Sequence, residues 1–153
     1  MTDLYAQAQR MCESPSEQIM LQALMGFRPQ CADPDADGSM LLDHPHLRIM
    51  PQFCVGPYRL DFAVLVTIPN VPQIKVDVEC DGHAFHHATP EQVQRDHERA
   101  RYLKERGWCV ERYTGSEIAQ SADGCVRKLE RAIDAEFAKL VLAAAEHGWH
   151  RAA

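Results

Sequence analysis

The chain has 153 residues, of which 46% are hydrophobic and 25% are charged, and its formal net charge is −6 at pH 7. This length allows one domain with a substantial core and is too short for two, and the composition excludes an intrinsically disordered chain. Because affinity for nucleic-acid phosphates comes mainly from Lys and Arg, the negative charge argues against a protein that coats nucleic acid. We therefore expect a single domain over residues 1–153.

The apolar runs and the cysteines predict a cytoplasmic protein. No apolar run approaches the roughly 20 residues that span a bilayer. The N-terminus has neither the basic region nor the apolar region of a signal peptide. The six cysteines are scattered without a C-x-x-C pair, which favours buried free thiols over disulfides or structural zinc.

A helix is predicted to begin at Pro15. The run Ser14-Pro15-Ser16-Glu17 has the pattern of a capping box with proline at the first helical position. The helix should stop at Gly26, and Glu17 should close its N-terminal cap. Its buried side chains are expected to be Ile19, Ala23 and Leu24.

The segment from Cys31 to Leu47 is predicted to be a loop, because it is rich in Pro, Asp and Gly. It contains Asp33-x-Asp35-x-Asp37-Gly38, which is the opening of an EF-hand calcium loop. The twelfth position of such a loop needs a bidentate glutamate, and here it is His44. An acidic surface turn is therefore favoured over a calcium site.

Three strands are predicted in the middle of the chain, over Leu47–Val55, Tyr58–Val66 and Ile74–Asp81. In Tyr58–Val66 one face would carry Leu60, Phe62, Val64 and Val66 and the other Arg59, Asp61, Ala63 and Leu65. In Ile74–Asp81 apolar and charged or polar residues alternate more sharply, which is the period of a strand with one buried face. The loop from Pro69 to Pro72 breaks both strands, because proline fixes φ and removes an amide donor. An antiparallel hairpin follows, and its apolar faces should be formed by Leu60, Phe62, Val64 and Val66 and by Ile74, Val76, Val78 and Cys80.

Two acidic residues oppose each other in this hairpin. If it is symmetric about Asn70, Asp61 lies directly across from Glu79. Opposed Cβ atoms lie roughly 4.5 to 5.5 Å apart, where like charges are destabilising. A divalent cation would bridge them, because Mg²⁺ accepts one or two protein carboxylates together with waters. The alternative is that both residues belong to a solvated outer face.

Three histidines follow the hairpin, at His83, His86 and His87. They lie on a connecting segment without a cysteine or a second histidine pair at a suitable distance for zinc. Solvated loop histidines are therefore favoured over a zinc site.

The rest of the chain is predicted to form two helices and one strand. Thr89-Pro90-Glu91-Gln92 is a second capping box, which should open a helix ending at Arg106. That helix should bury Val93, Ala100 and Leu103 and pair Asp96 with Arg99. A strand over Trp108–Tyr113 and a helix capped by Asp123 complete the chain. The expected architecture is a three-stranded antiparallel meander, a crossover helix, a further strand and flanking helices.

Four spaced motifs occur in order between Met50 and Ile118. They are Gln52-x-x-x-Gly56-x-Tyr58-x-x-Asp61-Phe62, Val78-Glu79-Cys80-Asp81-Gly82-His83-x-x-His86, Asp96-x-x-Arg99 and Gly107-Trp108-x-Val110-x-Arg112. Together with Glu17, they resemble the bacterial domain family related to very short patch repair endonucleases, within the restriction-endonuclease-like PD-(D/E)XK superfamily. The resemblance implies an α/β fold with a mixed β-sheet flanked by helices.

The resemblance also implies a metal-dependent endonuclease that hydrolyses DNA. Asp61 and Glu79 would bind Mg²⁺ or Mn²⁺, and the backbone carbonyl of Cys80 would complete the protein ligands. His86 matches a histidine that looks catalytic in the repair endonucleases, and a neutral imidazole can relay protons near pH 7. Glu17 matches a glutamate that approaches the metal from the first helix.

Asp81 and Gln52 are two further candidate site residues. The superfamily normally places lysine two residues after the glutamate, and this chain has Asp81 there. Gln52 is a polar residue on the neighbouring strand that could orient water. Two other functions remain open: a non-catalytic nucleic-acid-binding module of the same fold, which the missing lysine and the negative charge favour, and a protein-interaction domain with an acidic docking face.

Overall fold

The computed structural model describes residues 2–27, 46–81 and 88–147. The elements in chain order are α1 (Thr2–Met11), α2 (Pro15–Leu24), β1 (Leu47–Val55), β2 (Tyr58–Val66), β3 (Ile74–Asp81), α3 (Pro90–Glu105), β4 (Trp108–Thr114) and α4 (Gly115–Glu146). The three predicted strands of the meander are confirmed with their bounds. The predicted acidic turn over residues 33–38 and the three histidines His83, His86 and His87 lie outside the described residues.

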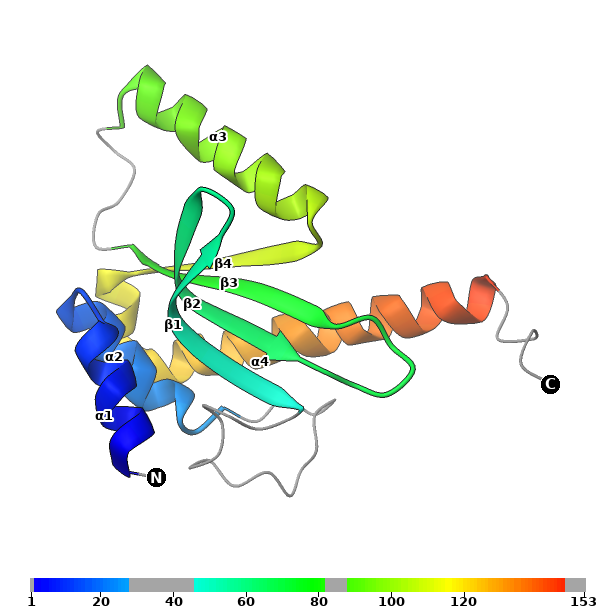
Figure 1. The fold of residues 1–153 in the computed structure, drawn as a ribbon, viewed down its shortest axis with the longest axis horizontal. Helices are drawn as coiled ribbons and strands as arrows, with labels where there is room; N and C mark the ends of the chain where they lie inside the picture. The colour runs from blue at the N-terminus through cyan, green and yellow to red at the C-terminus, as the bar shows by residue number, and fades with distance from the viewer. Residues whose placement is uncertain (1, 28–45, 82–87, 148–153) are drawn as a thin grey trace.

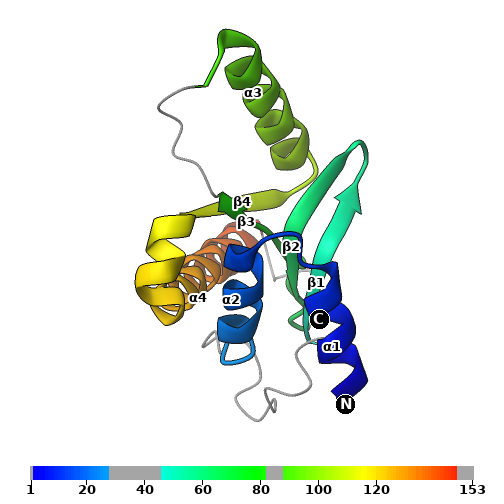
Figure 2. The same ribbon diagram turned by 90° about the vertical axis from the view of Figure 1, so that its left-hand side faces the viewer.

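The strands form one mixed sheet in the order β1-β2-β3-β4. β1, β2 and β3 are antiparallel neighbours, and β4 pairs in parallel with β3 after the crossover through α3. Helix α3 lies on one side of the sheet, and α2 and α4 lie on the other (Figures 1 and 2). This is the predicted α/β architecture.

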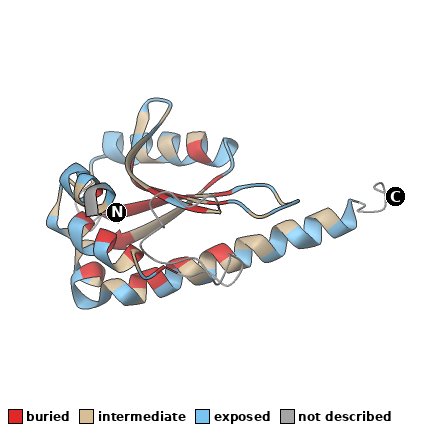
Figure 3. Ribbon diagram, turned by 60° about the horizontal axis from the view of Figure 1, so that its bottom comes forward, coloured by how far each residue is buried: buried red, intermediate tan, exposed pale blue. Residues whose placement is uncertain are grey.

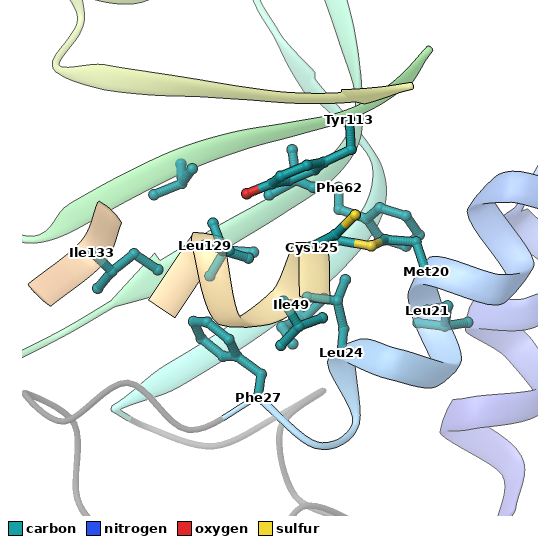
Figure 4. Packing of buried hydrophobic residues seen from close by; sticks show 14 of the residues in the cluster. Met20, Leu21, Leu24, Phe27, Ile49, Phe62, Tyr113, Cys125, Leu129 and Ile133 are labelled. Carbon is teal, nitrogen blue, oxygen red and sulfur yellow. The ribbon is translucent and has the colours of Figure 1, made fainter. Parts of the chain in front are cut away.

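The main core lies between the sheet and the two helices α2 and α4. Its buried members include Met20, Leu24, Phe62, Leu129 and Ile133, whose side chains meet in Figure 4. Burial is concentrated in the sheet and in these two helices, while the end of α4 towards the C-terminus is exposed (Figure 3). The larger part of the apolar surface is thus buried on one face of the sheet.

The buried face of α2 differs from the prediction. Met20, Leu21 and Leu24 are buried, whereas Ile19 is 44% exposed and Ala23 is only partly buried. The reason is that Met20, Leu21 and Leu24 lie three, four and seven residues after Glu17, which is the spacing of one continuous helical stripe. The same rotation turns Glu17 inward, where only 5% of it is exposed.

Helix α3 is much more exposed than predicted. Its capping box at Thr89 and Gln92 is confirmed, but Leu103 is its buried residue, and Val93 is 42% exposed. Ala100 is exposed as well. Figure 2 shows the physical reason: α3 rises away from the sheet, so that its first turns lie farther from the strands than its last turn.

The C-terminal helix begins earlier than predicted and is kinked. Thr114 caps α4, and Ser121 has non-helical backbone angles, φ −162° and ψ 89°. The hydroxyl of Ser121 accepts a hydrogen bond from the amide of Gly124 at 3.0 Å, so it caps the second part of the helix. The predicted cap at Asp123 is therefore wrong. Ser and Asp are comparable N-caps, and the kink decided between them.

Five cysteines can be placed, and all five are free thiols. Cys80 and Cys125 are buried, Cys12 and Cys109 are partly buried, and Cys54 is exposed. The prediction of buried thiols is therefore correct for two of them. Within the described parts of the chain, no helix combines the length and the apolar character that crossing a membrane requires.

Candidate active site

The sheet opens where the two predicted acidic residues lie. The β2–β3 ladder runs from Val66↔Ile74 to Phe62↔Val78, which is the predicted register, and the next position in that register places Asp61 across from Glu79. The β1–β2 ladder is interrupted at the same point. Pro51 pairs with Phe62 and Phe53 pairs with Leu60, and the ladder omits the position between them, where Gln52 lies opposite Asp61. Beyond it, the β1–β2 hairpin leaves β3 and rises beside α3 (Figure 1).

The backbone of β1 explains this opening. Gln52 has φ 51°, in the left-handed region that a residue with a side chain rarely adopts. It follows Pro51, which has no amide to donate. Past this point the faces of β2 change over: Leu60 packs with Ala63, Leu103 and Trp108, away from Phe62 in the main core. The prediction that Leu60 shares a face with Phe62 is therefore wrong.

The carboxylate of Asp61 is held against β3. Its Oδ2 accepts a hydrogen bond from the backbone amide of Cys80 at 2.8 Å. A side chain thus takes the place of a ladder carbonyl where the two strands separate. The carboxylate lies against the backbone of the residue whose carbonyl was predicted to be a ligand.

Glu17 and Gln52 meet beside this opening. Oε2 of Glu17 accepts hydrogen bonds from Nε2 of Gln52 at 2.8 Å and from the amide of Glu13 at 2.9 Å. Its Oε1 accepts from the hydroxyl of Ser14 at 3.0 Å. Glu17 therefore completes the start of α2, as predicted, and also fixes the amide of Gln52, which lies at the strand position opposite Asp61.

The charges of Glu17 and Asp61 both act on the thiol of Cys12. Burial, which is the largest cause, and these two charges together raise its pKa to about 11. Four of the predicted residues, Glu17, Gln52, Asp61 and Glu79, lie around the opening of the sheet.

Two residues that sequence reasoning did not assign to the site complete it. Nη2 of Arg99, on α3, lies 3.0 Å from Oδ2 of Asp77 and contacts Oε1 of Glu79. The side chain of Asp77 is 0% exposed. Asp77 and Glu79 are two residues apart on β3, so strand alternation places them on the same face. That alternation is the sequence signal that could have identified Asp77 as a site residue.

The predicted pairing of Asp96 with Arg99 is replaced by another. Arg112 donates two hydrogen bonds to the carboxylate of Asp96, at 3.0 and 3.3 Å, which lower the pKa of Asp96. Arg99 is left to contact Glu79. The i, i+3 spacing on α3 permitted the predicted pair, but the carboxylates on β3 offered Arg99 a more buried partner.

Asp77 is a buried acid with incomplete partners. Its pKa is raised to about 9, chiefly by burial and then by the adjacent carboxylate of Glu79, while Arg99 acts in the opposite direction. Neither carboxyl oxygen has a well-aligned hydrogen bond among the described residues. The carboxyl groups of Asp77 and Glu79 therefore share one guanidinium, that of Arg99.

This arrangement fits a hard divalent cation. The donors at hand are the carboxylate oxygens of Asp61 and Glu79 and the backbone carbonyl oxygen of Cys80, which are the oxygen ligands that such an ion prefers. Within the described residues, no three His, Cys, Asp or Glu side chains form a complete metal site. The protein would thus supply Asp61, Glu79 and the Cys80 carbonyl, which suits Mg²⁺ because that ion keeps several waters. His86 and the side chain of Asp81 lie outside the described part.

Comparison with known families gives one match. The model of the family REase_MTES_1575 matches residues 39–133, which is more than half of the chain. The chain belongs to this restriction-endonuclease-like family. The range matched by REase_MTES_1575 contains Gln52, Asp61, Asp77, Glu79 and Arg99. No curated protein and no solved structure matches the chain.

Membership of REase_MTES_1575 bears on the predicted kind of domain and on its predicted general role. It shows a restriction-endonuclease-like domain and indicates a nuclease role, with DNA as the substrate that such a role implies. Nucleases of this kind generally use divalent metal ions.

Proposed function

We propose that the protein is a Mg²⁺- or Mn²⁺-dependent endonuclease that hydrolyses phosphodiester bonds of DNA. The observation that carries the proposal is the opening of the sheet at Asp61, across from Glu79, in a chain of a restriction-endonuclease-like family. The proposal includes a site like that of very short patch repair endonucleases and a single domain acting in the cytoplasm, in repair, mobile-element or defence biology.

Asp61 and Glu79 would hold the cation, with the Cys80 carbonyl as a third ligand. When bound there, a divalent cation neutralises the phosphate, activates a water and stabilises the leaving alkoxide. The amide of Cys80 keeps Asp61 in place, because it donates to Oδ2 at 2.8 Å. Both ligands therefore start from fixed strands, which limits the cost of ordering them.

The remaining residues would handle water and protons. Gln52 gives its amide nitrogen to Glu17, which turns the amide oxygen into the end that can accept a hydrogen bond from the attacking water. His86 would move a proton between water and the DNA oxygens, as the motif match implies. Asp81, at the position where the superfamily has lysine, lies at the end of β3 and adds negative charge to the same strand.

A non-catalytic nucleic-acid-binding module is the second candidate function. Asp81 in place of lysine favours it, as does the net charge of −6. A protein-interaction domain would not need opposed carboxylates at an opening of the sheet, so it explains fewer of the contacts.

Metal binding and DNA cleavage are tested on the same variants. Mn²⁺ titration by calorimetry should show a site in wild type that is lost in Asp61→Asn and Glu79→Gln. Supercoiled plasmid with Mn²⁺ should be nicked by wild type and left intact by both variants. Glu105→Gln is the matched control, because Glu105 is an exposed carboxylate at the far end of α3. Equal Mn²⁺ binding in all four proteins would contradict the site, and an intact plasmid with wild type would favour the binding module.

A further inference from the structure

Arg99 has two contacts of different kinds. One is with Asp77, whose side chain is 0% exposed, and the other is with Glu79, whose side chain is 11% exposed. Asp77 is enclosed between the sheet and α3, whereas Glu79 lies at the opening of the sheet across from Asp61. The same nitrogen, Nη2, makes both contacts, so this end of the guanidinium lies between a buried carboxyl group and the opening of the sheet.

Glu79 has two competing uses for the same carboxylate. A divalent cation at Glu79 and Asp61 would stand next to the guanidinium of Arg99, and the two positive charges would repel each other. Arg99 must then yield its contact with Glu79. The buried contact with Asp77 does not depend on the cation, so it can keep the guanidinium beside the site.

A guanidinium released in this way suits a phosphate. It presents five N–H donors in a planar fork that matches phosphate oxygens, and it stays charged at every pH of interest. Arg112 has the same charge and lies in register with Glu79 on the neighbouring strand, but it donates twice to Asp96. The two arginines thus differ in where their donors are committed.

We propose that Arg99 is the residue that contacts the DNA phosphate in this site: it occupies Glu79 in the metal-free protein, and a divalent cation displaces it onto the phosphate while Asp77 holds it in place. This inference rests on the function proposed above. It adds to that function a switch of one arginine between a protein carboxylate and the substrate.

The first test measures cation affinity without DNA. Arg99→Gln should bind Mn²⁺ at least tenfold more tightly than wild type in calorimetric titration, because the guanidinium that competes with the metal ion for Glu79 is gone. Arg112→Gln should change the affinity less than threefold. Weaker Mn²⁺ binding by Arg99→Gln would mean that Arg99 holds Glu79 in position for the cation, and it would overturn the proposal.

The second test measures phosphate contact without cleavage. Affinity for a short DNA duplex is followed against salt concentration, once in EDTA and once in Ca²⁺, for wild type, Arg99→Gln and Arg112→Gln. Each phosphate contact adds roughly one to the slope of log affinity against log salt. In Ca²⁺ the wild-type slope should exceed that of Arg99→Gln by about one, and in EDTA the two should agree. Equal slopes in both solutions would overturn the proposal.

The third test joins the two. At saturating Mn²⁺, Arg99→Gln should nick plasmid at least a hundredfold more slowly than wild type, and Arg99→Lys should recover part of the loss. Thermal unfolding of each variant shows whether it is folded, and Arg99→Lys keeps the positive charge if Arg99→Gln is not. Wild-type nicking by Arg99→Gln would remove Arg99 from phosphate contact. If wild type does not nick DNA at all, the nuclease function fails, while the first two tests still decide the role of Arg99.

Discussion

Asp77 is a carboxylic acid placed where water cannot reach it, and this placement should be visible in the stability of the protein. Its pKa is raised to about 9, chiefly by burial. In the unfolded chain an aspartic acid titrates near 3.9. Between these values the folded protein keeps a proton that the unfolded chain has lost, so the free energy of unfolding should fall as the pH rises through this window.

Asp77→Asn should remove that part of the pH dependence, because the amide cannot ionise. Denaturant unfolding in EDTA, at about pH 5 and about pH 8.5, measures it in both proteins. We expect wild type to lose clearly more stability between the two pH values than the variant does. The opposite order, with wild type gaining stability as the pH rises, would mean that Asp77 is ionised in the folded protein.

Gln52 is a second residue in a locally unfavourable state, because its backbone is in the left-handed region. A left-handed backbone at a residue with a side chain costs on the order of 1–2 kcal/mol. The hydrogen bond to the buried Glu17 holds the side chain of Gln52 while the backbone remains in this conformation. The strained residue lies beside Asp61, which is where a functional constraint would retain it.

The end of the β1–β2 hairpin and helix α3 form one supporting unit. Tyr102 of α3 packs against Tyr58 with ring centroids 5.2 Å apart, and the guanidinium of Arg106 lies over the Tyr102 ring, 3.3 Å from its centroid. Gly56 sits at the turn with φ +57°, and a Cβ there would overlap the hydroxyl of Tyr102. The turn can approach the helix this closely because residue 56 has no side chain.

Gly56→Ala should therefore destabilise the protein. The left-handed backbone alone should cost about 1–2 kcal/mol, and the overlap with Tyr102 adds to it. Urea unfolding gives the change, with Gly26→Ala as the control, since a Cβ at Gly26 would only touch the carbonyl of Ala23 at 3.4 Å. In a Tyr102→Ala background the steric part should vanish. Equal effects of Gly56→Ala in both backgrounds would show that the hairpin does not rest on Tyr102.

Sequence reasoning located the elements whose signals are local. The strands β2 and β3 follow from strict alternation and the prolines between them, and the opposition of Asp61 and Glu79 follows from counting outward from Asn70. The caps at Ser14 and Thr89 follow from side chains that bond within one turn. In each case the cause lies within a few residues of the effect.

The rest depends on surfaces that meet only in the folded chain. Val93 is apolar, but whether it is buried depends on what lies beneath α3. The contact of Gln52 with Glu17 spans 35 residues, and that of Arg99 with Glu79 spans 20. No short-range rule distinguishes Arg99 bonding Glu79 from Arg99 bonding Asp96, because both carboxylates are within reach of one long side chain.

The molecule as a whole is held more firmly on one face of the sheet than on the other. The core against α2 and α4 contains most of the buried apolar residues, whereas the face towards α3 has a small cluster of Leu60, Ala63, Leu103 and Trp108. Parts of a protein with few buried contacts open locally at a lower free energy than the rest. Helix α3, which carries Arg99, should therefore open without unfolding the rest.

Hydrogen exchange should reveal this difference directly. Amides in α3 should exchange faster than those of α4 between Val126 and Ile133. Leu103→Ala should lower the opening free energy of α3 by about 2–5 kcal/mol, up to complete detachment, because Leu103 is its buried anchor. Leu129→Ala is the comparison, and it should lower the global stability by a similar amount. Equal protection of α3 and α4 in wild type would contradict this division.

Strand β1 has one open side, since it stands at the end of the sheet order. Open strands can recruit strands from other molecules and begin aggregation. The break at Pro51 and Gln52 divides β1 into two short pieces, because Pro51 has no amide and Gln52 turns the backbone out of the strand conformation. Each piece is shorter than the roughly six residues that an intermolecular zipper uses. The distortion that opens the candidate site should thus also hinder the addition of a further strand along the outer edge of β1.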